Sequence, residues 1–295
     1  MSFFRYKTAL QSIKYVERKR RRMIFSLFLL LFFFILFIIG TILFIRLPFV
    51  QINKVNIIGT DNIPINEIKD STFEYLEGKY LGIIPKSSII FFPKKTISNN
   101  LLNKYKIINN LSISRDGLSE ITVNITNRVP SAIVCDGFRG DNIPHDCFLS
   151  DKKGYIYNRA SIEDIDNNNY NKYFFPNSSE SLKEGTVFID EILFGKLQGF
   201  ISGSIQNGLL PLGILVGTNG EYEMYVENVF VKEGITTDIT IYFDNKTPFE
   251  TTLSNLITFW KDALEKNRNA NAPIFDSINL HFGNTIYYSK QDNNE

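Results

Sequence analysis

The longest apolar segment of the chain runs from Met23 to Ile45 and contains no charged residue. A helix rises about 1.5 Å per residue, so this segment spans roughly 35 Å, enough to cross a hydrocarbon core of about 30 Å. Its apolar side chains occur on every side, unlike those of an amphipathic surface helix. It is also longer than the apolar core of a cleaved signal peptide. We therefore predict one membrane-spanning helix over residues 23–46 and no second span.

Basic residues cluster directly before this segment. Residues 1–22 carry eight basic side chains and one acidic one, whereas the whole chain of 295 residues has a net charge of only +1. By the positive-inside rule this tail lies in the cytoplasm and residues 47–295 lie outside. A site for anionic lipid or nucleic acid is the alternative, but the rest of the chain is net negative, which argues against nucleic-acid binding. The topology signal comprises Arg18, Lys19, Arg20, Arg21 and Arg22.

Residues 47–128 alternate between strand-like and helix-like patterns. The dipeptide Asp116-Gly117 is a hairpin signal, because both turn positions favour a positive φ. In the strand that follows, Ile121, Val123 and Ile125 share one face. The patterns predict a β-α-α-β-β module with strands at 50–58, 107–115 and 118–127 and helices at 64–75 and 95–105.

Residues 129–290 are predicted to form a second, β-rich domain with antiparallel strands and flanking helices, which makes the whole chain α+β. The Asn-rich stretch 161–184 is poor in aliphatic residues, and we interpret it as a polar surface insertion. Residues 291–295 form a polar tail. The predicted strands are 132–134, 147–149, 155–157, 214–216, 222–226, 239–243, 277–282 and 285–288, and the helices are 191–207 and 248–267.

Composition excludes several classes of protein. With 44% hydrophobic and 21% charged residues, the chain is neither disordered in bulk nor a disulfide-dense miniprotein. It has two histidines, no spacing typical of a catalytic triad or a zinc protease, and no glycine-rich phosphate loop. The sequence therefore predicts neither an enzyme nor a cofactor.

Two cysteines, Cys135 and Cys147, fall in the exported region. A disulfide between them would close a loop of about a dozen residues and contribute roughly 3 kcal/mol. The polar character of the intervening sequence favours this bridge over two buried thiols. A metal site that includes His145 is a further alternative, although no fourth ligand is evident.

Several motifs occur in the order found in the FtsQ/DivIB-type bacterial cell-division proteins, which the chain resembles over residues 1–290 except 161–184. The entry strand contains Val55-Asn-Ile-Ile-Gly59, and the module ends in Arg128-Val-Pro130-Ser-Ala132. A turn of the form Asp-x-x-Gly follows at Asp151–Gly154. Near the end stand Ile278-Asn-Leu-His-Phe282 and Thr285-Ile-Tyr-Tyr288.

The resemblance implies that residues 47–128 form a POTRA (polypeptide-transport-associated) domain. It also implies partners: the FtsB/FtsL-like (DivIC/FtsL) single-span coiled-coil proteins, with the segment 278–288 as the binding strand. An interior hairpin that contributes only to the core is the alternative. This chain departs from the family at Asn127, Asn279 and His281. The expected partner-binding residues are Ile278, Leu280, Phe282, Ile286, Tyr287 and Tyr288.

The resulting expectation is a non-enzymatic scaffold of the divisome in the bacterial plasma membrane, located at the division septum. Two alternatives belong to other classes. One is a POTRA-containing secretion or assembly protein, which would bind unfolded exported chains. The other is a membrane-anchored sensor or cell-wall enzyme, which would need a ligand cleft with perturbed carboxylates.

Overall fold

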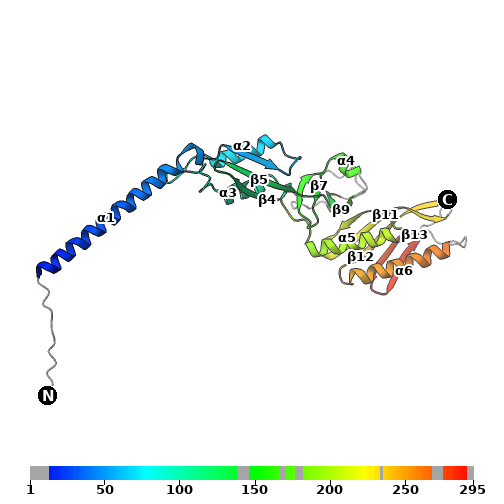
Figure 1. The fold of residues 1–295 in the computed structure, drawn as a ribbon. Coiled ribbons are helices and arrows are strands. Elements are labelled where there is room, and N and C mark those ends of the chain that lie inside the picture. The colour runs from blue at the N-terminus through cyan, green and yellow to red at the C-terminus, as the bar shows by residue number, and fades with distance from the viewer. Residues whose placement is uncertain are drawn as a thin grey trace, which may run out of the picture. The chain divides into compact units, whose positions relative to one another are not determined.

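The computed structural model describes residues 13–137, 146–166, 170–176, 182–232, 235–267 and 275–290. The fold is α+β, as predicted, with an N-terminal apolar helix followed by a β-rich region (Figure 1). Contacts divide the chain into two compact units. The first consists of Met1–Lys104 and Asn110–Thr126, and the second of Tyr105–Asn109 and Asn127–Glu295.

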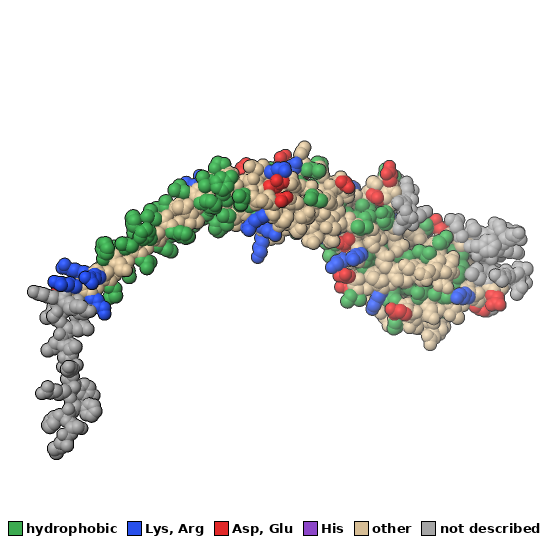
Figure 2. Space-filling model, viewed as in Figure 1, with side chains coloured by type: hydrophobic (Ala, Val, Ile, Leu, Met, Phe, Trp, Pro, Cys, Tyr) green, Lys and Arg blue, Asp and Glu red, His purple; other side chains and the backbone are tan. Residues whose placement is uncertain are grey.

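The predicted apolar helix is present as α1 (Ile13–Ile45). Its portion from Glu17 to Ile45 is long and apolar enough to cross a membrane. Nearly every side chain along that portion is exposed, including those of Arg18 to Arg22, and only Ile45 is buried. Figure 2 shows hydrophobic side chains along α1 and basic side chains gathered near its start.

After α1, the first unit contains a small sheet with strand order β1-β5-β4, in which β1 runs parallel to β5. The alternation predicted in the last strand is confirmed, because Ile121, Val123 and Ile125 are buried. A separate short pair, β2–β3, lies between the helices along the chain. The elements are η1 (Pro48–Val50), β1 (Lys54–Ile58), α2 (Ile65–Leu76), β2 (Lys79–Tyr80), β3 (Ile84–Pro85), α3 (Lys94–Lys104), β4 (Ile108–Asp116) and β5 (Glu120–Asn127).

The second unit contains a nine-stranded sheet with the order β14-β13-β12-β11-β10-β9-β6-β7-β8. Three neighbouring pairs are parallel: β6 with β9, β9 with β10, and β12 with β13. The strands are β6 (Ala132–Asp136), β7 (Asp146–Ser150), β8 (Ile156–Arg159), β9 (Asn171–Phe175), β10 (Pro211–Val216), β11 (Glu221–Lys232), β12 (Ile235–Asp244), β13 (Phe275–Phe282) and β14 (Thr285–Lys290). The remaining elements are α4 (Ile162–Asp166), α5 (Glu191–Gln206), η2 (Thr218–Gly220) and α6 (Phe249–Asn267).

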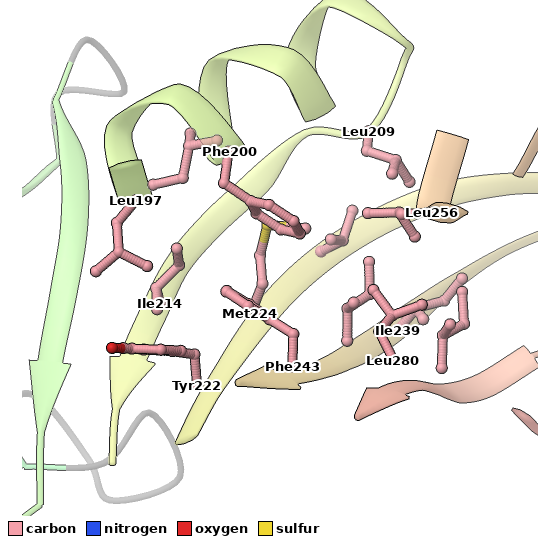
Figure 3. Close-up of a cluster of buried hydrophobic side chains, with 14 of the residues drawn as sticks. Leu197, Phe200, Leu209, Ile214, Tyr222, Met224, Ile239, Phe243, Leu256 and Leu280 are labelled. Atoms are coloured by element: carbon pink, nitrogen blue, oxygen red, sulfur yellow. The ribbon is translucent and has the colours of Figure 1, made fainter. Parts of the chain in front are cut away.

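Helices α5 and α6 pack on one face of this sheet. The side chain of Asp190 caps α5 by accepting the backbone N–H groups of Ile192 and Leu193 at 2.9 and 3.2 Å. Figure 3 shows Phe200 of α5 above Met224 and the neighbouring strand residues. The ring of Phe200 stacks on that of Phe243 with centroids 4.3 Å apart. The main core of the unit therefore lies between the helices and the strands.

The opposite face has a smaller core around the disulfide. Cys135 of β6 lies directly opposite Cys147 of β7, and the two sulfur atoms are bonded. Both side chains are buried in a cluster with Phe174 of β9. The bond therefore ties together two neighbouring strands of the sheet, and it makes neither cysteine available as a thiolate ligand.

The prediction that 161–184 is a surface insertion is wrong for its middle part. Residues 171–175 form β9, which lies between β6 and β10 in the middle of the sheet. Tyr173 is fully buried, and its ring lies 5.4 Å from that of Phe194. Burial raises the pKa of Tyr173 well above its usual value. The short run Tyr173-Phe-Phe175 supplies the apolar strand, but Asn and Asp residues around it dominate the composition of the segment.

Two of the sequence motifs meet in a largely buried ion pair. Arg128 binds Asp151 through a charge-assisted hydrogen bond, and 16% and 9% of the two side chains are exposed. The Arg128 guanidinium also donates to the carbonyl oxygen of Lys106 at 3.1 Å and lies 3.9 Å above the ring of Tyr155. Asp151 in turn accepts the backbone N–H groups of Lys153 and Tyr155 at 2.8 and 3.1 Å. The pair thus fixes the turn between β7 and β8 to the chain that enters the second unit.

Removal of this ion pair should destabilise the second unit selectively. We expect Arg128→Ala to lower its free energy of unfolding by about 3 kcal/mol, because Asp151 would stay buried without its partner. Urea denaturation followed by the fluorescence of Trp260, the single and buried tryptophan, measures this change.

The matched control is Arg159→Ala, which breaks an exposed pair with Asp146 whose side chains are 67% and 50% exposed. Its cost should stay within about 1 kcal/mol. Equal losses for the two variants would contradict a structural role for the Arg128 pair.

Candidate partner-binding edge

The nine-stranded sheet ends in β14 on one side and β8 on the other. An outermost strand has backbone donors and acceptors on its free side, where another chain can pair with it. The two edges of this sheet differ in whether that free side is already used.

The β8 edge is covered by the segment 183–188 of the same chain. The backbone N–H of Ile156 donates to Thr186 at 2.8 Å, and its carbonyl accepts the N–H of Gly185 at 2.8 Å. The N–H of Phe188 donates to Gly154 at 3.0 Å, and Tyr155 bridges to Val187. This edge is therefore already occupied from Gly154 to Ile156, where β8 begins.

The β14 edge is open. It pairs with β13 in antiparallel register, with Ile278 opposite Tyr288 and Asn279 opposite Tyr287. Within the described ranges, no strand pairs with its other side. The turn between the two strands is held by Asn255 of α6, whose side-chain amide donates to the carbonyl of Gly283 at 2.9 Å. The hairpin thus holds β14 in place with its outer side unpaired.

Aromatic side chains flank this edge on the helix-covered face. The ring of Tyr288 lies 5.1 Å from Phe275 and 5.6 Å from Phe259 of α6. Tyr288 is nevertheless 46% exposed, and Ile286 beside it is half-buried against the main core. These side chains form an apolar surface next to the free backbone groups of β14.

The opposite face of the edge carries a second aromatic pair. Tyr287 and Phe282 are 56% and 57% exposed, and their rings lie 4.9 Å apart. Adjacent residues of a strand point to opposite faces, so the two tyrosines place one ring on each side of β14. A partner strand could contact aromatic surface on both faces.

The face of the sheet that carries Tyr287 also has a row of side chains across four strands. Glu223 of β11 lies opposite Tyr242 of β12, which lies opposite Asn279 of β13, which lies opposite Tyr287. Burial, with Glu223 and Asp276 as smaller causes, raises the pKa of Tyr242. Its phenol therefore stays neutral and the row carries a single carboxylate.

The structure separates the six predicted partner-binding residues into two groups. Ile278 and Leu280 are 0% and 2% exposed and belong to the main core, so only their backbone could contribute to the edge. Phe282, Ile286, Tyr287 and Tyr288 all lie at the hairpin or its edge strand. Phe282 is 57% exposed, although strict strand alternation would place it on the buried face of Ile278 and Leu280.

The reason is an irregularity in β13. The pairing register shifts between Asn279 and Phe282, so the strict alternation that would turn Phe282 inward is lost. The side chain of Asn279 accepts the backbone N–H of His281 at 3.0 Å, a local bond that competes with regular pairing. Sequence reasoning also missed Phe259 and Phe275, whose only signal is their position beside core residues.

No metal-binding group of three or more His, Cys, Asp or Glu side chains occurs in the part of the chain that the structure describes. Both Cys135 and Cys147 are used by the disulfide. His145, the third member of the alternative metal site, lies outside the described residues.

No protein-family model matches the chain, and no curated protein matches it. The functional assignment therefore depends on the residues and their geometry.

Substitutions on the two strands of the hairpin should differ strongly in their cost to folding. Leu280→Lys should unfold the second unit or cost about 4 kcal/mol, because it places an unpaired charge in the core. Tyr287→Lys should cost less than about 1 kcal/mol, because the side chain is already exposed. Thermal denaturation of the two variants separates these outcomes. A stable Leu280→Lys variant would contradict the burial of β13.

Proposed function

We propose that the protein is a non-enzymatic, membrane-anchored scaffold of the FtsQ/DivIB type that binds other components of the bacterial division machinery. The open β14 edge carries this proposal, because the opposite edge of the same sheet is covered by residues 183–188 while β14 presents unpaired backbone beside exposed aromatic rings. Such an edge suits recognition by strand addition.

The organisation of the chain supports the proposal. An apolar helix precedes a unit whose order of β1, α2, α3, β4 and β5 resembles a POTRA domain with the additional pair β2–β3. The Arg-x-Pro and Asp-x-x-Gly motifs, which resemble those of the family, also interact with each other in this protein. Their first residues, Arg128 and Asp151, form the largely buried pair that holds the start of the β-rich unit.

The proposed partner is an extended segment next to the coiled coil of an FtsB/FtsL-like pair. Added beside β14, it would satisfy the free donors and acceptors of this strand. Its alternate side chains would pack on Tyr288 and Phe259 on one face and on Tyr287 and Phe282 on the other. Backbone bonds would supply affinity and the aromatic surfaces specificity.

The membrane helix has a part in this function. The proposed partners are single-span proteins themselves, so their insertion in the same bilayer raises their effective concentration at the edge. In this proposal the protein resides in the bacterial plasma membrane at the division septum, with the basic run Arg18–Arg22 on the cytoplasmic side.

Binding of the exported segments of the FtsB/FtsL-like proteins from the same genome tests the proposal. The full chain in nanodiscs should capture them, and Tyr288→Lys should weaken capture roughly thirtyfold, equivalent to about 2 kcal/mol, as expected for an interface hot spot. Ile286→Lys should weaken it as well.

The control is Val187→Lys, which changes an exposed apolar residue at the covered β8 edge and should leave capture unchanged. Failure of the folded wild-type chain to bind would contradict the division assignment. Equal binding by wild type and a folded Tyr288→Lys variant would remove β14 as the interface.

A further inference from the structure

The C-terminal end of α1 is fixed against the rest of the first unit and does not lead into a free linker. Ile45, its last residue, is 3% exposed. Arg46 follows, and its guanidinium donates to the carbonyl oxygen of Ile83 through Nε at 3.2 Å and Nη2 at 2.9 Å. The side chain of Gln51 donates to the carbonyl of Arg46 at 2.9 Å. The turn between β2 and β3 is therefore fixed beside the end of α1.

Exposed apolar side chains collect at this end of the first unit. Leu81 is 97% exposed, and the residues on either side of it in the turn are uncharged. Leu118, at the tip of the β4–β5 hairpin, is 64% exposed. We call the set the juxtamembrane patch, which consists of Phe49, Leu81, Ile83, Ile90, Phe91 and Leu118.

Hydrogen bonds to the backbone bring these segments together. Asn53, just before β1, donates to Ser119 at 2.9 Å, which places the hairpin tip at the start of β1. The N–H of Ile89 donates to Val50 at 2.9 Å, and Arg115 donates to Ile90 at 3.0 Å. All three segments thus lie at the end of the unit that receives α1.

We propose that the juxtamembrane patch lies in the interfacial layer of the bilayer. This inference rests on the proposed role of α1 as a membrane anchor. Arg46 ends the apolar helix, so its charge belongs at the level of the lipid headgroups. Ile83, bonded to that guanidinium, then lies at the same depth. Phe49 of the patch lies against Phe44 of α1, with ring centroids 6.0 Å apart, so the patch continues the apolar surface of the helix. Figure 2 shows the hydrophobic side chains along α1.

The positive charge beside the patch also favours contact with lipid. Lys79 is exposed and Lys86 half-exposed on the two sides of the turn that carries Leu81. Lysines at this level attract the phosphate groups of anionic lipids, while the leucine and isoleucine side chains enter the acyl boundary. The first unit would then be attached to the bilayer at two points, the helix and the patch, and would keep a fixed orientation toward the membrane.

The test uses the full chain in vesicles of phosphatidylethanolamine and phosphatidylglycerol. Because both native cysteines are joined in a disulfide, Leu81→Cys provides a single free thiol for an environment-sensitive fluorophore. Lipids brominated on their acyl chains should quench this probe several-fold more strongly than aqueous iodide does. The matched control is Ile58→Cys, an exposed position at the far end of β1, where iodide should quench more strongly.

A third probe, Leu36→Cys in the middle of α1, separates the failure of this inference from that of the anchor. Lipid quenching at Leu36 with iodide quenching at Leu81 would overturn the patch alone. Absence of lipid quenching at both positions would overturn the anchor as well. Protection of Leu81 from both quenchers would show that a protein surface covers it, which also contradicts insertion in lipid.

Discussion

On the outer side of an edge strand, the backbone N–H and C=O groups need hydrogen-bond partners from outside the sheet. This constraint distinguishes the two edges of the β-rich unit. At β8 the segment 183–188 supplies the missing partners through the bonds at Ile156. At β14 no described strand does so, although the hairpin is held in place by Asn255 and by packing of Tyr288 against α6. A stable, unpaired edge of this kind is a surface for strand addition.

Other features of the chain, far from β14 in the sequence, stabilise the sheet or contribute to membrane attachment. The Arg128–Asp151 pair fixes the turn between β7 and β8, and the disulfide joins β6 to β7 close to the β8 end of the sheet. The apolar helix α1 carries the first unit, and the juxtamembrane patch would hold that unit against the bilayer. In the proposed function, anchoring and edge presentation together would make the protein a scaffold that acts by binding.

Sequence patterns predicted the elements with strong periodicity. The apolar helix, the alternation of Ile121 to Ile125 and the helices α5 and α6 all follow from side-chain spacing. Local composition concealed β9, because its five residues lie among polar ones and only parallel pairing with β6 and β10 makes them a strand. The outward turn of Phe282 was equally hidden, since it depends on the local bond between Asn279 and the backbone of His281. Register irregularities and long-range pairings leave little trace in periodicity.

Hydrogen–deuterium exchange of the full chain in nanodiscs, with and without the FtsB/FtsL-like segments, tests the central claim most directly. Strand addition at the open edge should slow exchange of alternate backbone amides between Thr285 and Ser289 at least tenfold, a change of about 1.4 kcal/mol in opening free energy. The amide of Ile156 in β8, already bonded to Thr186, should be unchanged. Saturated binding with unaltered exchange in β14 would contradict the account, because the partner would then occupy another surface.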